Sequence, residues 1–154
     1  MSQTSELTAA EWRTLELAPF WVLSSLSGTY RNFDPVELEL FAEVLDAAAL
    51  APGRLGRDVI ASVRADPAAM QECYEADGRS IAAGLYAVAD VLARTPIAEA
   101  TMFRQMLLGT LGLRLAEGRG RFGRSATAED MHKLRIAVQL LADTSPASDR
   151  SGAA

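Results

Sequence analysis

This sequence contains few of the residues that build most enzyme and metal sites. Among its 154 residues there is one cysteine, Cys73, and one histidine, His132. A single thiol cannot form an internal disulfide or a zinc site made from several cysteines, and no basic residue at helical spacing activates it. Ser-His-Asp and Cys-His catalysis would both depend on His132, and no recognisable catalytic motif surrounds that residue. The composition argues against most catalytic classes.

The chain also has few of the residues that favour β-strands. Aromatic residues make up 6%, whereas Ala and Leu together supply 48 of the 154 positions. Ala and Leu lose little conformational freedom in a helix, and no segment shows sustained alternation of apolar and polar residues. The sequence predicts an all-α fold, a single compact bundle of six or seven helices over residues 7–142. Residues 1–6 and 143–154 are expected to be flexible tails.

Capping signals divide the chain into these helices. Thr8 with Glu11 forms a capping box for the first helix, which Pro19 should kink. Later starts are marked by an N-cap residue, in several cases followed by proline. The predicted helices are 8–26, 35–50, 55–64, 67–93, 96–117 and one from 127. The segment 67–93 is either one long helix or two, and we favour a break near Asp77 and Gly78 because Ser80 could cap a second helix. Apolar residues occupy most of the circumference of the helix at 96–117, so we expect it to be the central buried helix. Gly109 and Gly112 should let a neighbour approach it closely.

The net charge of −5 is distributed unevenly along the chain. Residues 1–50 contain 8 acidic and 2 basic residues, residues 51–100 contain 7 and 5, and residues 101–154 contain 5 and 8. Part of the acidic excess forms a predicted outward stripe on one helix, Glu39, Glu43 and Asp46. This distribution favours a charged partner or a head-to-tail neighbour over a dedicated DNA-binding function.

No targeting segment is recognisable. Residues 1–11 lack the basic start and apolar stretch of a signal peptide. The most apolar stretch, 106–115, is much shorter than the roughly 20 residues that a membrane span needs. We expect a cytoplasmic protein without membrane insertion.

One helix–loop–helix pattern occurs twice, about 90 residues apart. In each copy a helix ends at a glycine, Gly28 or Gly118, and a loop leads to a capped helix with an acidic residue in its first turn, Glu37 or Asp130. In this pattern the chain resembles the TerB-like family of tellurite-resistance-associated proteins over roughly residues 7–142. That family is all-helical and consists of two pseudo-repeated halves, each with an Asp-Gly at this turn.

The resemblance implies a role in stress response or metal-ion handling, through acidic surfaces and partner proteins and without catalysis. Two features depart from the family pattern. The residue before the glycine is Ser27 in the first half and Glu117 in the second, and both loops are longer than the family's turn. The missing aspartates weaken any metal site carried over from the family.

The segment 129–132 gives the sharpest indication of metal chemistry. Glu129 and His132 are three positions apart and would share one helix face, the spacing used by di-iron carboxylate bundles. Those bundles need a second such motif, which a single histidine excludes. A mononuclear divalent-metal site remains as a hypothesis, with Glu37, Glu129, Asp130 and His132 as candidate ligands. The alternative is that the acidic pair stabilises a helix N-terminus while His132 is half exposed.

The loop at 118–124 contains three arginines and one aromatic residue, Arg119, Arg121, Phe122 and Arg124. Its glycines could let the guanidinium groups reach phosphates while Phe122 stacks on a base. The Gly-Lys-Ser/Thr ending of a phosphate-binding P-loop is absent. The alternative is that Phe122 anchors the loop to the core and the arginines are solvated or paired with acidic residues.

Together these features favour a non-catalytic helical interaction module. It would present its acidic first half and basic second half to a protein partner or to another copy of itself. The alternative is a nucleic-acid or anion-binding accessory protein that uses the Arg-rich loop, residues 118–124. A metal-assisted hydrolase built around His132 is a third interpretation. No organic cofactor is expected, and a divalent metal is the one candidate ligand.

Overall fold

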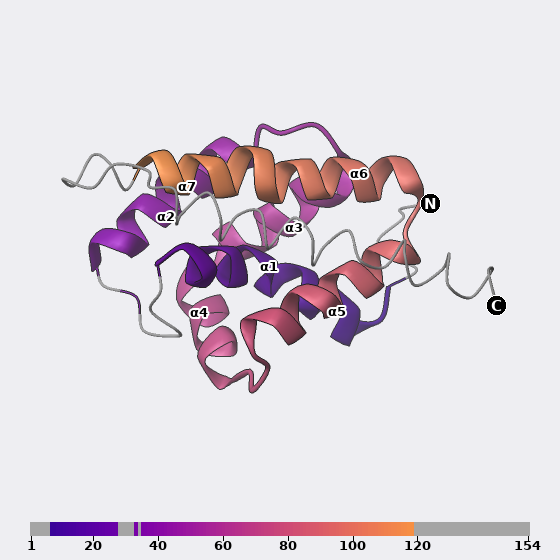
Figure 1. Ribbon diagram of the computed structural model, residues 1–154, viewed down its shortest axis with the longest axis horizontal. Coiled ribbons are helices and arrows are strands. Elements are labelled where there is room, and N and C mark those ends of the chain that lie inside the picture. The colour runs from indigo at the N-terminus through magenta and orange to yellow at the C-terminus, as the bar shows by residue number, and fades with distance from the viewer. Residues whose placement is uncertain (1–6, 28–32, 34, 119–154) are drawn as a thin grey trace.

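The computed structural model describes residues 7–27, 33 and 35–118. All regular secondary structure in this part of the chain is helical, which confirms the predicted all-α class (Figure 1). Its elements are α1 (Ala9–Ser27), α2 (Pro35–Ala48), α3 (Arg54–Ala65), α4 (Pro67–Ala76), α5 (Ile81–Ala93), α6 (Ile97–Gln105), the π-helical segment η2 (Met106–Gly112) and α7 (Leu113–Gly118). The last three are continuous and form one long helical segment along the bundle, residues 97–118, which we call the rod.

Most of the predicted helix starts are present in the structure. The Thr8 N–H donates to the Glu11 carboxylate (2.9 Å) and the Glu11 N–H donates to the Thr8 hydroxyl (3.1 Å), so the capping box is formed. The side chains of Asp66 and Ser80 cap α4 and α5, which confirms the predicted break between these helices. Thr95 does not cap α6, because its hydroxyl donates back to the last turn of α5. Local side-chain chemistry thus determines most of the helix boundaries.

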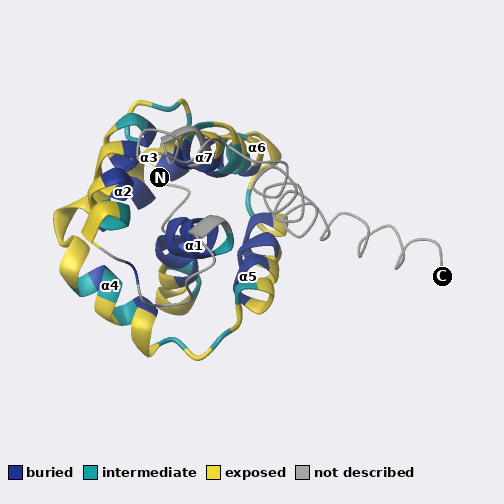
Figure 2. Cartoon of the chain, turned by 60° about the vertical axis from the view of Figure 1, so that its left-hand side comes forward, coloured by how far each residue is buried: buried dark blue, intermediate teal, exposed yellow. Residues whose placement is uncertain are grey.

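Helix α1 lies at the centre of the bundle. All of its residues from 14 to 24 are buried, and α3, α4, α5, η2 and α7 pack around it (Figure 2). Pro19 lies inside α1 without ending it. The prediction that the helix at 96–117 would be central is wrong, because its buried residues form a stripe on one side and Ile97, Thr101 and Leu113 are exposed. This stripe packs on α1 through η2 and α7 and on α3 and α5 through α6. Gly112 belongs to this stripe, but Gly109 is exposed and approaches no neighbour.

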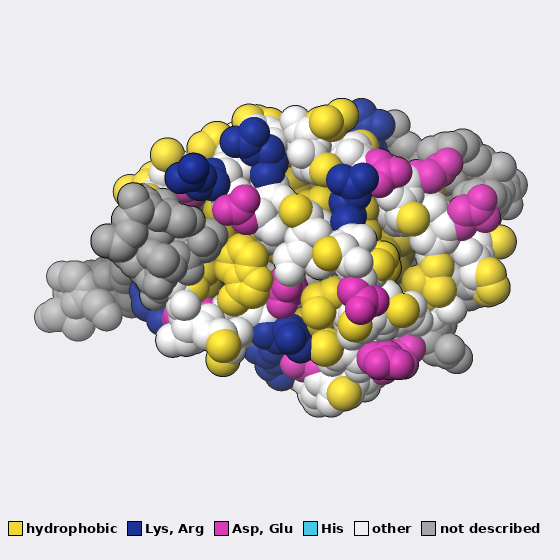
Figure 3. Space-filling model, turned by 180° about the vertical axis from the view of Figure 1, so that it is seen from behind, with side chains coloured by type: hydrophobic (Ala, Val, Ile, Leu, Met, Phe, Trp, Pro, Cys, Tyr) yellow, Lys and Arg dark blue, Asp and Glu magenta, His cyan; other side chains and the backbone are white. Residues whose placement is uncertain are grey.

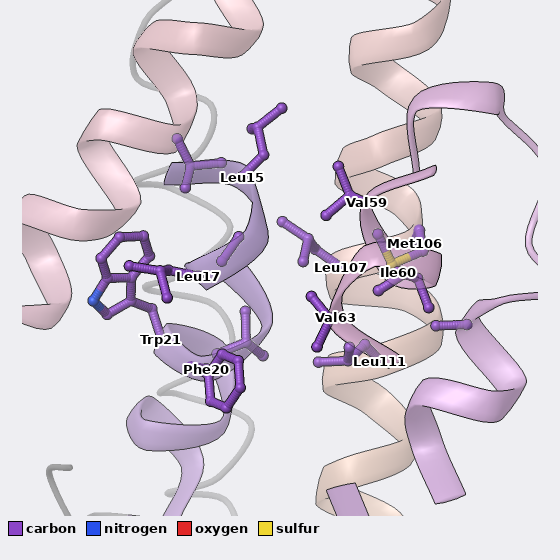
Figure 4. Packing of buried hydrophobic residues seen from close by; sticks show 14 of the residues in the cluster. Leu15, Leu17, Phe20, Trp21, Val59, Ile60, Val63, Met106, Leu107 and Leu111 are labelled. Carbon is purple, nitrogen blue, oxygen red and sulfur yellow. The ribbon is translucent and has the colours of Figure 1, made fainter. Parts of the chain in front are cut away.

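Two sides of α1 contribute to the core. Figure 4 shows Leu15 and Phe20 of α1 beside residues of α3 and η2, including Ile60 and Leu107, which are both fully buried. On the opposite side Trp21 points toward α5. A Cβ atom on Gly84 would lie 2.1 Å from Cε2 of this indole, so glycine is what allows α5 to approach α1. Among the described elements, α1 and α5 are the pair with the most extensive mutual contact, and this close approach lies between them.

The loop between α2 and α3 is fixed against α6. Gly53 has a φ of 106°, a left-handed conformation that favours glycine, and its Cα position faces Met102. Because glycine has no side chain to cap α3, a carboxylate from α6 does so: Glu99 Oε1 accepts the Leu55 N–H at 2.9 Å. A contact between residues 44 positions apart therefore holds the start of α3.

The remaining sequence predictions lie outside the described residues. These are the helix from 127, the loop residues 119–124, both tails, and the second copy of the helix–loop–helix pattern beyond Gly118. In the part of the chain that is described, no helix has the length and hydropathy needed to cross a membrane.

Candidate functional site

The predicted metal and anion sites are not assembled in the described part of the structure. Glu37 lies in the first turn of α2 and is partly exposed. The other candidate metal ligands, Glu129, Asp130 and His132, lie outside the described residues, as do Arg119, Arg121, Phe122 and Arg124. Within residues 7–27, 33 and 35–118 no three His, Cys, Asp or Glu side chains are grouped so that they could hold a metal ion. These sites remain predictions.

The structure instead contains a groove that the sequence did not predict. It has a volume of about 400 Å³ and lies between α2 and α4, which sit on either side of α1 in Figure 1. Helix α2 packs on α3 and on the rod, whereas α4 packs on α1 and α3, so a gap remains between α2 and α4. The groove is lined by Leu38, Phe41, Ala42, Leu45 and Asp46 of α2, Pro67, Ala68 and Gln71 of α4, Phe20 of α1 and Arg64 of α3.

The floor of the groove is aromatic and well packed. The rings of Phe20 and Phe41 lie 5.0 Å apart between centroids at 55°, and Phe20 stacks on Tyr74 at 5.3 Å. All three rings are almost completely buried. The Tyr74 hydroxyl is hydrogen-bonded to Ser24 of α1, which holds the ring in place. Because packing fixes its floor, the groove is preformed.

The walls of the groove combine small apolar side chains with one ion pair. Ala42 and Ala68 face it from α2 and α4, and both are exposed. At its edge Arg64 Nη2 lies 3.0 Å from Asp46 Oδ1. Both side chains are about half exposed or more, so this pair contributes at most about 1 kcal/mol to stability. The polar groups of the groove therefore lie at its margin and its interior is apolar.

These lining residues are suited to binding a ligand and do not form a catalytic group. The ten side chains include no hydroxyl, thiol or imidazole group, so they contain no nucleophile–base pair. Asp46, the one acidic member, is paired with Arg64. What the groove offers is apolar contact area with charges at its edge.

A second polar cluster joins α1 to α3 and α4 outside the groove. Glu16, only 4% exposed, accepts hydrogen bonds from Arg13 Nε (3.0 Å) and from the Ser62 hydroxyl. Arg13 also donates to the Cys73 sulfur through Nη1, at 2.7 Å. Local sequence does not predict this contact, because Arg13 is 60 positions from Cys73 and reaches it from another helix. Since the buried carboxylate is satisfied by partners from two helices, the cluster acts as a structural cross-link.

The carboxyl group of Glu11 has a lowered pKa, and its role is also structural. The hydrogen bond from the Thr8 backbone N–H lowers the pKa of Glu11 below its usual value, and the charge of Arg94 lowers it further. Arg94 follows α5, and its guanidinium forms an ion pair with Glu11. This pair connects the start of α1 to the end of α5.

The comparisons with known proteins identify no relative. No family model, no curated protein and no solved structure matches this chain. The resemblance to the TerB-like family therefore remains a prediction, and the groove is interpreted from its own geometry.

Proposed function

We propose that this chain is a non-catalytic helical interaction module that binds an apolar helical segment of a protein partner in the groove between α2 and α4. The observation that supports the proposal is the open, apolar groove of about 400 Å³. Its volume lies within the roughly 300–1,000 Å³ that ligand sites occupy. An amphipathic helix inserts side chains at positions i, i+3 or i+4, and i+7 into a groove of this kind.

A protein segment fits this groove better than a small polar substrate does. Interior polar groups orient small ligands in their sites, whereas here Asp46, Arg64 and Gln71 are the polar lining residues and two of them pair with each other. Ala42 and Ala68 leave room between the walls for side chains that enter from outside. The preformed aromatic floor also reduces the entropy lost on binding, because little of it has to be ordered.

A groove-filling variant tests this function. Ala68→Trp places an indole at the groove from an exposed position of α4, and Ala82→Trp makes the same change at an exposed position of α5 outside the lining. Each full-length variant is purified from the source cells beside the wild type, and the recovered proteins are quantified by mass spectrometry. We expect at least one protein to be recovered with the wild type and with Ala82→Trp but not with Ala68→Trp. Equal recovery with both variants, with both folded by circular dichroism, would overturn the proposal.

Three other sequence-based proposals have no support in the described geometry. The role in stress response or metal handling rests on the TerB-like resemblance alone, and the cytoplasmic location rests on the absence of a recognisable targeting segment. The alternative function, nucleic-acid or anion binding, rests on the loop at 118–124. Changing Arg119, Arg121 and Arg124 to Ala should abolish salt-sensitive phosphate binding if that alternative is correct.

A further inference from the structure

The two helices that form the walls of the groove carry an excess of negative charge. The outer surface of α2 bears Glu39, Glu43 and Asp46, and the outer surface of α4 bears Glu72 and Glu75, all of them exposed. The lining contributes one basic residue, Arg64. Neither wall helix contains Lys or Arg, so both walls are net negative, whereas Asp46 and Arg64 balance each other within the lining. In Figure 3, acidic side chains gather among hydrophobic ones toward the end of the molecule at which α2 and α4 lie in Figure 1.

The negative charge of the two walls does not depend on any of these carboxylates being without a partner. Glu43 takes part in an interaction, and Glu75 accepts a hydrogen bond from Gln71 at 3.2 Å. Neutral donors such as Gln71 leave the charge in place. Exposed charges act on a ligand over about 8 Å at physiological ionic strength, which is enough to reach a segment bound between the two walls.

From this arrangement we infer that the segment recognised by the groove is a basic amphipathic helix, with an apolar stripe that enters the groove and Arg or Lys side chains that face its two margins. The inference rests on the proposed function and names the chemistry of its partner. The two walls favour positive charge on both flanks of the apolar stripe. The same field repels nucleic acid and anionic lipid surfaces, so it selects a protein segment over either of them.

Two synthetic peptides measure this preference on the full-length protein. Both are helices with one identical leucine stripe, and one carries Lys and Arg on its flanks where the other carries Glu. Binding is followed by NMR through the methyl signals of Ala42 and Ala68, with Ala82 as the reference outside the groove. We expect the basic peptide to bind at least ten-fold more tightly than the acidic one in 20 mM salt, with a smaller difference in 300 mM salt.

Charge-reversal variants identify the source of the preference. Glu39→Lys and Glu72→Lys change one exposed carboxylate on each wall, and Asp58→Lys makes the same change at an exposed position of α3 outside the lining. Each wall variant should lower the affinity for the basic peptide several-fold, whereas Asp58→Lys should change this affinity less than two-fold.

The outcomes separate the inference from the function on which it rests. If both peptides shift the groove signals with equal affinity, the charge preference is wrong and apolar docking stands. If the basic peptide shifts Ala82 as much as Ala42, the attraction is general and the inference is also wrong. If neither peptide shifts the groove signals at millimolar concentration, the docking function itself is contradicted.

Discussion

The contact between Gly84 and Trp21 allows a sharp test of how the bundle is held together. In the variant Gly84→Ala the new Cβ would lie 2.1 Å from Cε2, 2.4 Å from Cδ2 and 2.6 Å from Cζ2 of the indole. Ordinary van der Waals contact begins at 3.4 Å, so the closest pair is about 1.3 Å too close. Trp21 is fully buried and cannot move toward solvent. Helices α1 and α5 must therefore separate or the indole must leave its place.

The magnitude follows from two opposing effects. Replacing glycine by alanine inside a helix stabilises it by about 1 kcal/mol. Overpacking a core costs about 1–3 kcal/mol and occasionally more. Because the obstacle here is an enclosed ring and not the end of a flexible side chain, we expect Gly84→Ala to lower the free energy of unfolding by about 2 kcal/mol. For a domain of this size that corresponds to a fall in Tm of about 4–8 °C.

Urea unfolding followed by circular dichroism measures this loss, with Gly109→Ala as the matched control. Gly109 also lies inside a helix, but no atom of another described element lies within 4 Å of its added Cβ. The control should be as stable as the wild type, or more stable by up to about 1 kcal/mol. A double-mutant cycle with Trp21→Phe adds a second test, because the smaller ring makes room for the Cβ. The Trp21 Nε1 has no hydrogen-bond partner within the described structure, so Phe removes volume but no hydrogen bond.

In that cycle the double variant should be more stable than the sum of the two single effects predicts, by at least about 1 kcal/mol. Wild-type stability of Gly84→Ala would refute the contact that we describe. Strict additivity of the two changes would show that the loss arises elsewhere than at the indole.

Three further predictions concern the loop, a cap and pH. Gly53→Ala should lose about 1–3 kcal/mol of stability in urea unfolding because of the φ of 106°; an unchanged urea midpoint would contradict this conformation. Glu99→Ala should lose about 0.5–2 kcal/mol by removing the acceptor of the Leu55 N–H, whereas Glu99→Gln, which keeps an acceptor oxygen, should lose less; equal losses would argue against the cap. The lowered pKa of Glu11 gives stability that is present above its ordinary value of 4.5 and is lost as the pH falls through the folded-state pKa. Stability measured from neutral pH downward should therefore fall more steeply for the wild type than for Glu11→Gln, and parallel curves would contradict the assignment.

Local features of the sequence predicted the helices well. The capping box at Thr8 and the caps at Asp66 and Ser80 depend on side chains within three residues of the group they bind, so they can be recognised without knowledge of the fold. The break between α4 and α5 was predicted for the same reason.

The arrangement of the helices was harder to predict, since burial depends on neighbours. Both α1 and the helical segment 97–118 are rich in apolar residues, but within the described part of the chain α1 is the one with an unbroken buried run, residues 14–24, in contact with α3, α4, α5, η2 and α7. Thr14 and Glu16 of α1 are polar but buried, because Arg79 from the loop between α4 and α5 and Ser62 from α3 supply hydrogen bonds that the local sequence does not reveal. The π-helical geometry of η2 likewise has no signal in local propensity.

The groove illustrates the same limit. Leu38 is partly exposed on the groove wall. Leu38 and Ala42 extend the apolar surface of α2 beyond the buried stripe to which Leu45 belongs, so this surface is wider than one neighbouring helix covers. The width of this apolar surface indicates, from the sequence alone, that part of it is left for a groove. The opposite wall on α4 could not be predicted, because it depends on how two helices about 30 positions apart are placed by α1 and α3.

The most direct test of the docking function is photo-crosslinking from inside the groove. A photoreactive phenylalanine analogue replaces Ala42, or Ala82 as the control, and the cells are irradiated before the crosslinked peptides are sequenced. The docking function predicts a crosslink from position 42 to an apolar helical segment of another protein. It also predicts that this crosslink is absent from position 82 and is lost when Ala68→Trp fills the groove. Identical crosslinks from positions 42 and 82, or a crosslink from position 42 that persists with Ala68→Trp, would contradict it.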